Sequence, residues 1–229
     1  MSQRRTQLLI AAARLFAHYG FRKTSVEEVT RSAGVSKGAF YLEFQTKEDL
    51  FREVVTSEFC AYLNDAEERI LADQEGGRLS RIYHHSVEAL LDRPFLRALY
   101  TDADGTMNGI LHTHGTDRYH PRILLGAEFI AQMQANGLLR EDASPEETSH
   151  TLSVLTLGPL LAEPLLRFPE SPSLEQTLKS ISRMIVASLE TYDGDPAAGK
   201  RAFHKLKSQM VEALKESRPD GSHRSAPGA

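Results

Sequence analysis

Apolar residues recur along the chain at the three- and four-residue spacing of an amphipathic helix, and alternating stretches typical of strands are nearly absent. The first apolar stripe contains Leu9, Ala12 and Phe16 and ends at Gly20. Glycine closes many helices because it adopts a left-handed conformation without steric cost. We therefore predict an all-α fold whose first helix covers about residues 3–19.

Two short helices are predicted next. Thr24-Ser25 followed by Glu27-Glu28 gives two overlapping capping boxes, which open a helix that ends at Ala33-Gly34. Ser36 can cap a third helix from Lys37 to Phe44. The connection between them contains Gly34, which can take a positive φ in a tight turn. This spacing predicts a helix-turn-helix unit.

The remaining helices are predicted from the same periodicity and from capping residues. A long helix starts after Thr46 and runs to about residue 71, and others are expected at about 79–91, 95–101, 119–136, 145–167 and 173–192. A last helix opens at Asp195-Pro196. We divide the chain into a head at 1–48, a helical body at 49–195, an additional helix at 196–217 and a disordered tail at 218–229.

Charge is distributed unevenly along the 229 residues, whose net charge is −4. Residues 1–50 carry eight Lys/Arg and five Asp/Glu, a charge of +3, whereas residues 51–196 carry twelve and twenty-three, a charge of −11. Residues 197–229 carry seven and three, a charge of +4. A basic head on an acidic body indicates that the head, and not the body, contacts a polyanion.

The third predicted helix presents a small polar face beside four cations. Its Phe40 side is apolar, and the opposite side carries small residues that allow close approach to a groove. Phosphate contacts are expected from Arg22, Lys23, Lys37 and Lys47, which lie before and around this helix. The full set of candidate DNA-binding residues is Arg22, Lys23, Thr24, Ser36, Lys37, Gly38, Ala39, Tyr41, Glu43 and Lys47.

Residues 3–50 resemble the DNA-binding domain of the TetR family of transcriptional regulators. The resemblance rests on TSVEEV at 24–29, AGVSKGAFY at 33–41, Phe44 and TKEDL at 46–50. It implies a homodimer whose third helices enter successive major grooves of a pseudo-palindromic operator. It further implies that Lys37, Gly38, Ala39 and Tyr41 approach bases or backbone and that Lys47 contacts phosphate.

Two positions depart from the family pattern. Ala39 stands where many members have threonine, which removes a hydroxyl but keeps a methyl able to touch thymine. Glu43 stands where the family often has histidine, and a carboxylate there repels phosphate unless it accepts a cytosine amino proton. The operator sequence is therefore not transferable from the family.

The body is expected to hold a largely apolar small-molecule effector in a pocket inside each subunit. Candidate wall residues are Phe59, Tyr62, Met107, Phe129 and Met133, with His84, His85 or His112 as polar contacts. The alternative is that these side chains form an ordinary core and that His112 and His114 are solvated residues of a loop between helices. The close pair His112 and His114 lacks the neighbouring cysteine or Glu-x-x-His spacing that would support a metal site, so we predict no metal and no cofactor.

The sequence indicates a regulator and not an enzyme, because phosphate-binding glycine loops, nucleophile elbows and H-E-x-x-H are missing. The single Cys60 fits a reducing cytoplasm, and the longest apolar run, 152–166, is too short and too interrupted for a membrane span. The predicted function is a ligand-responsive regulator, a repressor released from its operator by a small molecule. The alternative is a sensor or carrier that has lost specific DNA binding.

Two mechanical expectations follow. The dimer interface should come mainly from 145–167 and 173–192. Residues such as Leu152 and Leu161 give this region more apolar surface than a single outer helix needs to pack on the body. The helix that starts at Thr46 belongs to both head and body, so its tilt should link ligand binding to the spacing of the two third helices.

Overall fold

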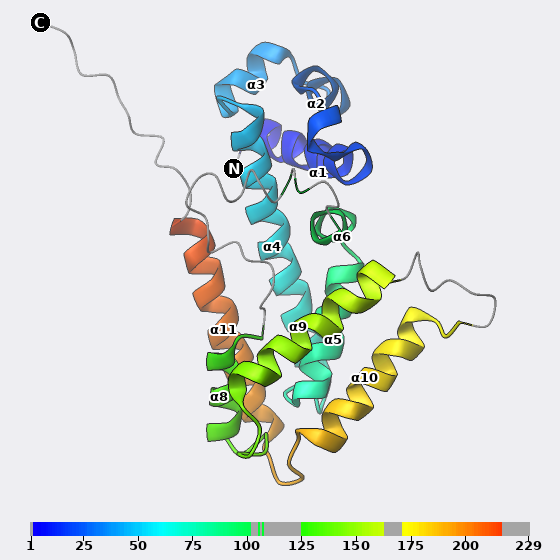
Figure 1. Cartoon of the computed structure of the whole chain (residues 1–229). Helices are drawn as coiled ribbons and strands as arrows, with labels where there is room; N and C mark the ends of the chain where they lie inside the picture. Colours follow the sequence, from blue (N-terminus) through cyan, green and yellow to red (C-terminus); the bar gives the residue numbers. More distant parts are fainter. Residues whose placement is uncertain (1, 102–104, 106, 108–124, 163–170, 217–229) are drawn as a thin grey trace, which may run out of the picture.

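Three helices, α1 (Gln3–Lys23), α2 (Val26–Ala33) and α3 (Lys37–Glu43), form a head at one end of the molecule in the computed structural model (Figure 1). The structure describes residues 2–101, 105, 107, 125–162 and 171–216. Gly20 has a φ of 76°, so the regular part of α1 ends at Tyr19 as predicted and a short turn continues to Lys23. Gly34 closes α2 with a φ of 68°, which gives the tight turn that the helix-turn-helix unit requires.

The body is built around α4 (Lys47–Ala72), which leaves the head and runs down through the body (Figure 1). Helices α5 (Leu79–Leu91) and α11 (Pro196–Glu216) pack along α4, and α10 (Leu174–Ser188) covers α5. Helix α9 (Pro145–Ala162) contacts both α8 (Ala127–Ala135) and α6 (Pro94–Tyr100). Apart from one bridge between Leu139 and Glu190, the regular structure in the described ranges is helical, which confirms the predicted all-α fold.

The predicted helix at 173–192 is too long at its carboxyl end. Helix α10 stops at Ser188 because the following backbone pairs with the segment after α8. The Arg140 N–H donates to the Leu189 carbonyl at 2.9 Å, and the Thr191 N–H donates to the Leu138 carbonyl at 3.1 Å. Residues 119–124 and 163–167 of two other predicted helices lie outside the described residues, so α8 and α9 can be compared with the prediction only in part.

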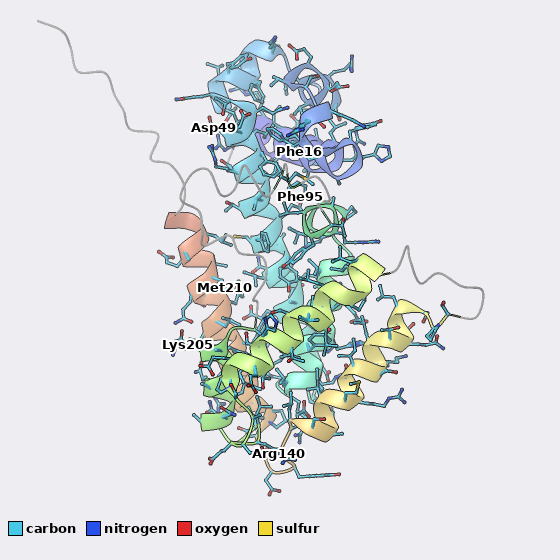
Figure 2. All side chains as sticks on the ribbon, viewed as in Figure 1. Phe16, Asp49, Phe95, Arg140, Lys205 and Met210 are labelled. Atoms are coloured by element: carbon cyan, nitrogen blue, oxygen red, sulfur yellow. The ribbon has the colours of Figure 1, made fainter. Side chains whose placement is uncertain are left out.

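A row of aromatic rings joins the head to the body. The Phe51 ring on α4 lies 5.5 Å from that of Phe16 and 5.2 Å from that of Phe21, both on α1, and 5.9 Å from that of Phe95 on α6. Figure 2 shows Phe16 in the head and Phe95 below it, both on the same side of α4. The core of the head is therefore continuous with that of the body, and α6 supports α1 directly. Nothing in the sequence pattern predicted this contact.

Helix α11 is seated tightly on the carboxyl end of α4. A Cβ atom on Gly77 would lie 1.7 Å from the Pro196 carbonyl oxygen, so only glycine allows this approach. Lys200 Nζ donates to the Asp73 carbonyl at 2.5 Å, and Glu67 on α4 accepts from His204 at 2.7 Å and from Lys207 at 2.5 Å. The last helix is thus an integral part of the body.

Candidate DNA-binding surface and body cavity

Helix α3 buries one side and exposes the other. Ser36 caps the helix by accepting from the Ala39 N–H at 3.1 Å, and Phe40 is fully buried against α1 and α2. On the outer side Lys37, Gly38 and Ser36 are exposed, Tyr41 is 52% exposed and Leu42 is 77% exposed. A Cβ on Gly38 would meet nothing closer than 3.9 Å. This open surface, residues 36–42, has the small profile that entry into a major groove requires.

One cation, Lys37, lies on this surface, and two others, Arg22 and Lys23, lie in the last turn of α1. Lys37 forms an ion pair with Glu27 in the first turn of α2, and both side chains are more than half exposed. The hydrogen bond from Lys37 lowers the pKa of Glu27, yet an exposed pair of this kind is weak and can be exchanged for a phosphate. Arg22 and Lys23 are exposed, and in the described part of the chain no hydrogen bond or ion pair holds either side chain.

Lys47 is an internal anchor. Its ammonium group donates to the carbonyls of Phe21 at 3.0 Å and Thr24 at 2.9 Å, and it lies 4.1 Å from the centre of the Phe21 ring. Burial lowers the pKa of Lys47. Two of the three ammonium donors thus join α4 to the end of α1, which leaves one donor for a phosphate. The phosphate contact stays a prediction.

Two candidate residues have structural roles that the sequence analysis did not assign. Thr24 is 1% exposed, and its hydroxyl donates to the Gly20 carbonyl at 2.9 Å, so the side chain closes α1 and cannot reach DNA. The Glu43 carboxylate accepts from the Ser2 hydroxyl at 2.6 Å and pairs with Arg5 at 3.4 Å, and its side chain is only 14% exposed. The Glu43 carboxylate is thus engaged by Ser2 and Arg5, and its effect on phosphate or cytosine stays a prediction.

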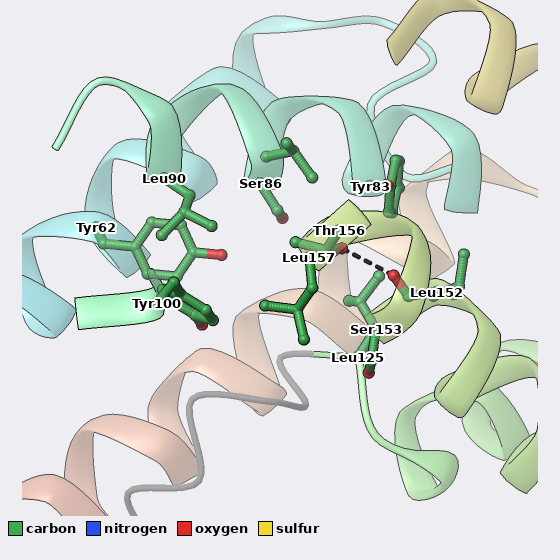
Figure 3. A pocket seen from close by; sticks show the side chains of 11 residues that line it. Tyr62, Tyr83, Ser86, Leu90, Tyr100, Leu125, Leu152, Ser153, Thr156 and Leu157 are labelled. Carbon is green, nitrogen blue, oxygen red and sulfur yellow. Dashed lines mark hydrogen bonds between the residues drawn. The ribbon is translucent and has the colours of Figure 1, made fainter. Parts of the chain in front are cut away.

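A cavity of about 40 Å³ lies in the body between α4, α5, α6 and α9 (Figure 3). Its apolar lining consists of Val87, Leu90, Leu125, Leu152 and Leu157. Its polar lining consists of hydroxyl-bearing side chains alone: Tyr62, Tyr83, Ser86, Tyr100, Ser153 and Thr156. This volume accommodates a few water molecules, so a larger molecule fits only if the walls move apart.

The hydroxyl groups of the cavity differ in their hydrogen bonding. Ser153 and Thr156 donate to carbonyls one turn earlier on α9, at 2.9 Å and 2.8 Å. Tyr83 Oη and Ser86 Oγ are buried, with Thr156 near the first and Tyr62 near the second, but neither atom makes a hydrogen bond of normal geometry within the described residues. Burial raises the pKa of Tyr83 to about 12 and raises the pKa of Tyr62 as well, so both phenols stay neutral. The hydroxyl groups of Tyr83 and Ser86 are therefore neutral hydrogen-bond donors whose protons remain available.

The predicted effector-binding residues are only partly brought together. Tyr62 lines the cavity, whereas Phe59, Met107, Phe129 and Met133 are buried but do not line it. His84 and His85 belong to an ionic cluster instead, with Nε2 atoms 3.2 Å from Glu88 and 2.9 Å from Asp73, respectively. His112 lies outside the described residues.

The sequence analysis missed the polar lining of the cavity. Tyr83 and Ser86 on α5, and Ser153 and Thr156 on α9, occupy positions that face the interior of the bundle. The signal was present as hydroxyl-bearing residues spaced three apart within apolar helix faces. Pairing these two faces requires the tertiary structure.

Two absences apply to the described residues only. In that part of the chain no three His, Cys, Asp or Glu side chains are grouped so that they could hold a metal ion. Among the described helices, none combines the length and the apolar character needed to cross a bilayer.

The sequence of the head matches a known family model. Residues 8–54 match the family model described as bacterial regulatory proteins, tetR family. The HTH-type transcriptional repressor KstR2 of Mycolicibacterium smegmatis is 32% identical over 103 residues, which are 44% of this chain and 50% of KstR2. The chain spans between 17% and half of the length of the first curated relatives it matches.

Solved structures extend the likeness to the whole fold. A γ-butyrolactone receptor matches with a TM-score of 0.54 and 21% identity over 91% of this chain and 98% of the receptor. The ketosteroid transcriptional regulator KstR2 of Mycobacterium tuberculosis matches with a TM-score of 0.52 and 20% identity, covering 83% of this chain and 97% of that protein. The resemblance predicted from the sequence is confirmed: residues 8–54 match the model of the tetR family of bacterial regulatory proteins, and the chain shares the overall fold of the solved structures named above.

Proposed function

We propose that this chain is a transcriptional repressor that binds operator DNA as a homodimer through α3 and is released by a small molecule. The observation that carries the proposal is the open surface 36–42, which includes the exposed Lys37, on a head that matches the family model and exposes Arg22 and Lys23 at the end of α1. The relative with the longest alignment named above is called a repressor, and a solved neighbour is named a γ-butyrolactone receptor. These names support a regulator that responds to a ligand and not an enzyme, and a protein that binds operator DNA would act in the cytoplasm.

Exposed apolar residues on α9 and α10 support the homodimer. Val154 and Leu161 are 54% and 51% exposed, and they lie seven residues apart on one face of α9. Met184 on the adjacent α10 is 60% exposed. Leu152, which the sequence analysis assigned to this interface, is instead buried and lines the cavity. In a dimer whose two-fold axis passes beside α9 and α10, each subunit would cover these exposed residues of the other.

The cavity has a direct mechanical route to the head. Tyr62 belongs to α4 and Tyr100 belongs to α6, and both helices contact α1 (Figure 1). A ligand larger than the empty cavity must separate these walls and so favours a state in which α4 and α6 are displaced. If the displaced state binds operator less well, a ligand that prefers this state lowers the affinity for operator. Operator then lowers the affinity for the ligand by the same factor.

The alternative function, a carrier or sensor without specific DNA binding, rested on Glu43 alone. Because the Glu43 carboxylate is bound by Ser2 and Arg5, it does not present an unpaired negative charge beside the open surface. No other described feature favours that alternative.

Electrophoretic mobility shifts test the proposal. A duplex is first enriched from a random DNA pool by the protein itself, and its affinity is then compared with that of a scrambled duplex over a series of salt concentrations. We expect a preference of at least about a thousandfold at physiological salt and a linear fall of log affinity with log salt. Failure to enrich any sequence would contradict operator binding.

A further inference from the structure

We propose that the cavity between α4, α5, α6 and α9 selects an uncharged, mainly apolar ligand that carries a carbonyl or hydroxyl oxygen. This inference rests on the proposed ligand-responsive function and adds the chemical class of the ligand. It is carried by two observations: the polar lining is made of hydroxyl groups alone, and two of those groups are buried without a hydrogen bond of normal geometry to any described residue.

The two unpartnered groups identify where the ligand oxygen binds. Tyr83 is 1% exposed and Ser86 is 3% exposed, and both lie on α5 one turn apart. Figure 3 shows both side chains extending from α5 toward the α9 wall, with Tyr62 and Tyr100 toward the other end of the cavity. A buried hydroxyl without a hydrogen bond costs free energy, and a ligand oxygen accepting from Tyr83 or Ser86 would recover it.

The same lining disfavours charged ligands. Not one of the residues that line the cavity carries an ionisable acid or base other than the tyrosine phenols. The nearby titratable side chains of α5, His84, His85 and Glu88, contact one another and Asp73, and none of them lines the cavity. A carboxylate or ammonium in the cavity would therefore be desolvated without a counter-ion, which is unfavourable by several powers of ten in affinity.

Hydrogen-bond supply further favours a ligand oxygen. Thr156 and Ser153 already use their protons on α9 carbonyls, so they offer only lone pairs. Tyr83 and Ser86 still have protons to donate. A ketone can accept from these two donors, and an alcohol can in addition donate to the Thr156 oxygen. A plain hydrocarbon would leave Tyr83 and Ser86 unpaired.

Matched probes of two shapes test the ligand class. The cyclic set is cyclohexanone, cyclohexanecarboxylate, cyclohexylammonium and methylcyclohexane, and the linear set is methyl octyl ketone, decanoate and decylammonium. Binding to the full chain is measured by titration calorimetry at neutral pH. We expect at least one ketone to bind, and its charged counterparts to bind about a hundredfold more weakly or not at all. Equal or tighter binding of a charged probe, or no binding of either ketone, would overturn the proposal.

Two variants locate the contact. Tyr83→Phe and Ser86→Ala each remove a hydroxyl that has no protein partner, so the thermal midpoint of the free chain should stay unchanged or rise. Affinity for the ketone should fall about three- to tenfold in at least one of them, whereas affinity for methylcyclohexane should not fall. Tyr192→Phe is the matched control, because Tyr192 is 99% exposed and lies outside the cavity. Unchanged ketone affinity in both cavity variants would overturn the assignment.

The operator assay separates this inference from the proposed function. If a ketone binds but leaves affinity for the enriched duplex unchanged, the ligand class stands and the switch fails. If a charged probe binds and releases the duplex, the switch stands and the ligand class is wrong.

Discussion

Arg5 Nε at the start of α1 donates to Glu53 Oε1 on α4 at 2.7 Å, and Glu53 is only 8% exposed. The same guanidinium donates to the Glu43 carbonyl at the end of α3 at 2.8 Å and lies 4.4 Å from the centre of the Phe44 ring. The Arg5 side chain therefore fixes α3 relative to α1 and α4, and the position of the exposed surface 36–42 depends on it.

Arg5→Met is expected to lower the free energy of unfolding by about 2 kcal/mol, because it removes the guanidinium that pairs with the buried Glu53 carboxylate. Operator affinity should fall as well. Glu53→Gln distinguishes two roles of Arg5. If Arg5 positions α3, the weaker contact with the glutamine side chain should lower operator affinity. If Arg5 acts by its charge alone, the loss of a negative charge at residue 53 should raise operator affinity. Lys179→Met, which breaks an exposed pair with Glu175, should change stability by less than about 0.5 kcal/mol.

Arg22→Ala and Lys23→Ala should weaken binding to every duplex and reduce the slope of log affinity against log salt by about 0.9 for each phosphate that the variant no longer neutralises. The salt titration measures this slope directly. Lys205→Ala on α11 is the control, because Lys205 is an exposed cation remote from the head. An identical slope in the head variants and the control would exclude phosphate binding by Arg22 and Lys23.

Lys47→Ala should have a second effect that Arg22→Ala lacks. The substitution removes the donor that serves the Phe21 and Thr24 carbonyls, so the thermal midpoint should fall together with operator affinity. Calorimetric unfolding distinguishes the two cases. A normal midpoint with lower affinity would assign Lys47 to phosphate alone.

Leu161→Arg should convert the dimer into a monomer, because it places a charge on the exposed apolar face of α9. Sedimentation at micromolar concentration measures the mass, and operator affinity should fall with it. Tyr192→Arg adds the same charge at a fully exposed site and should remain dimeric. A natural chain that is monomeric at these concentrations would refute the interface.

Acid should release α11 from α4. Burial favours the neutral form of Glu67, but hydrogen bonds from Lys207 and His204 outweigh it, so its pKa lies below the usual 4.5. A carboxyl with a lowered folded pKa stabilises fully above its unfolded pKa, and this contribution disappears as the pH falls through the folded value. The difference in unfolding free energy between the natural chain and Glu67→Gln should therefore be about 1–2 kcal/mol at neutral pH and shrink below pH 4.5. A difference independent of pH would contradict this linkage.

Local signals in the sequence were sufficient for the head. The capping pair Ser25 with Glu28 is present as predicted, and the long helix starts after Thr46 as predicted, where Thr46 pairs with Asp49; in both pairs the partners are only three residues apart. The partner of Glu43 could not be predicted, because Ser2 and Arg5 meet it only after α1 folds across α3. The cavity was missed for the same reason, since its donors and its walls come from four separate helices.

The shared ring of Phe51 has a consequence for protein engineering. Exchanging heads between relatives at residue 48 would separate Phe16 and Phe21 from the rings that cover them, because Phe51 and Phe95 would come from the other parent. A chimera that transfers the operator specificity of this chain must therefore carry the first turns of α4 and the matching face of α6. The transferable unit is a discontinuous set of residues, and recombination at a single point in the gene cannot supply it.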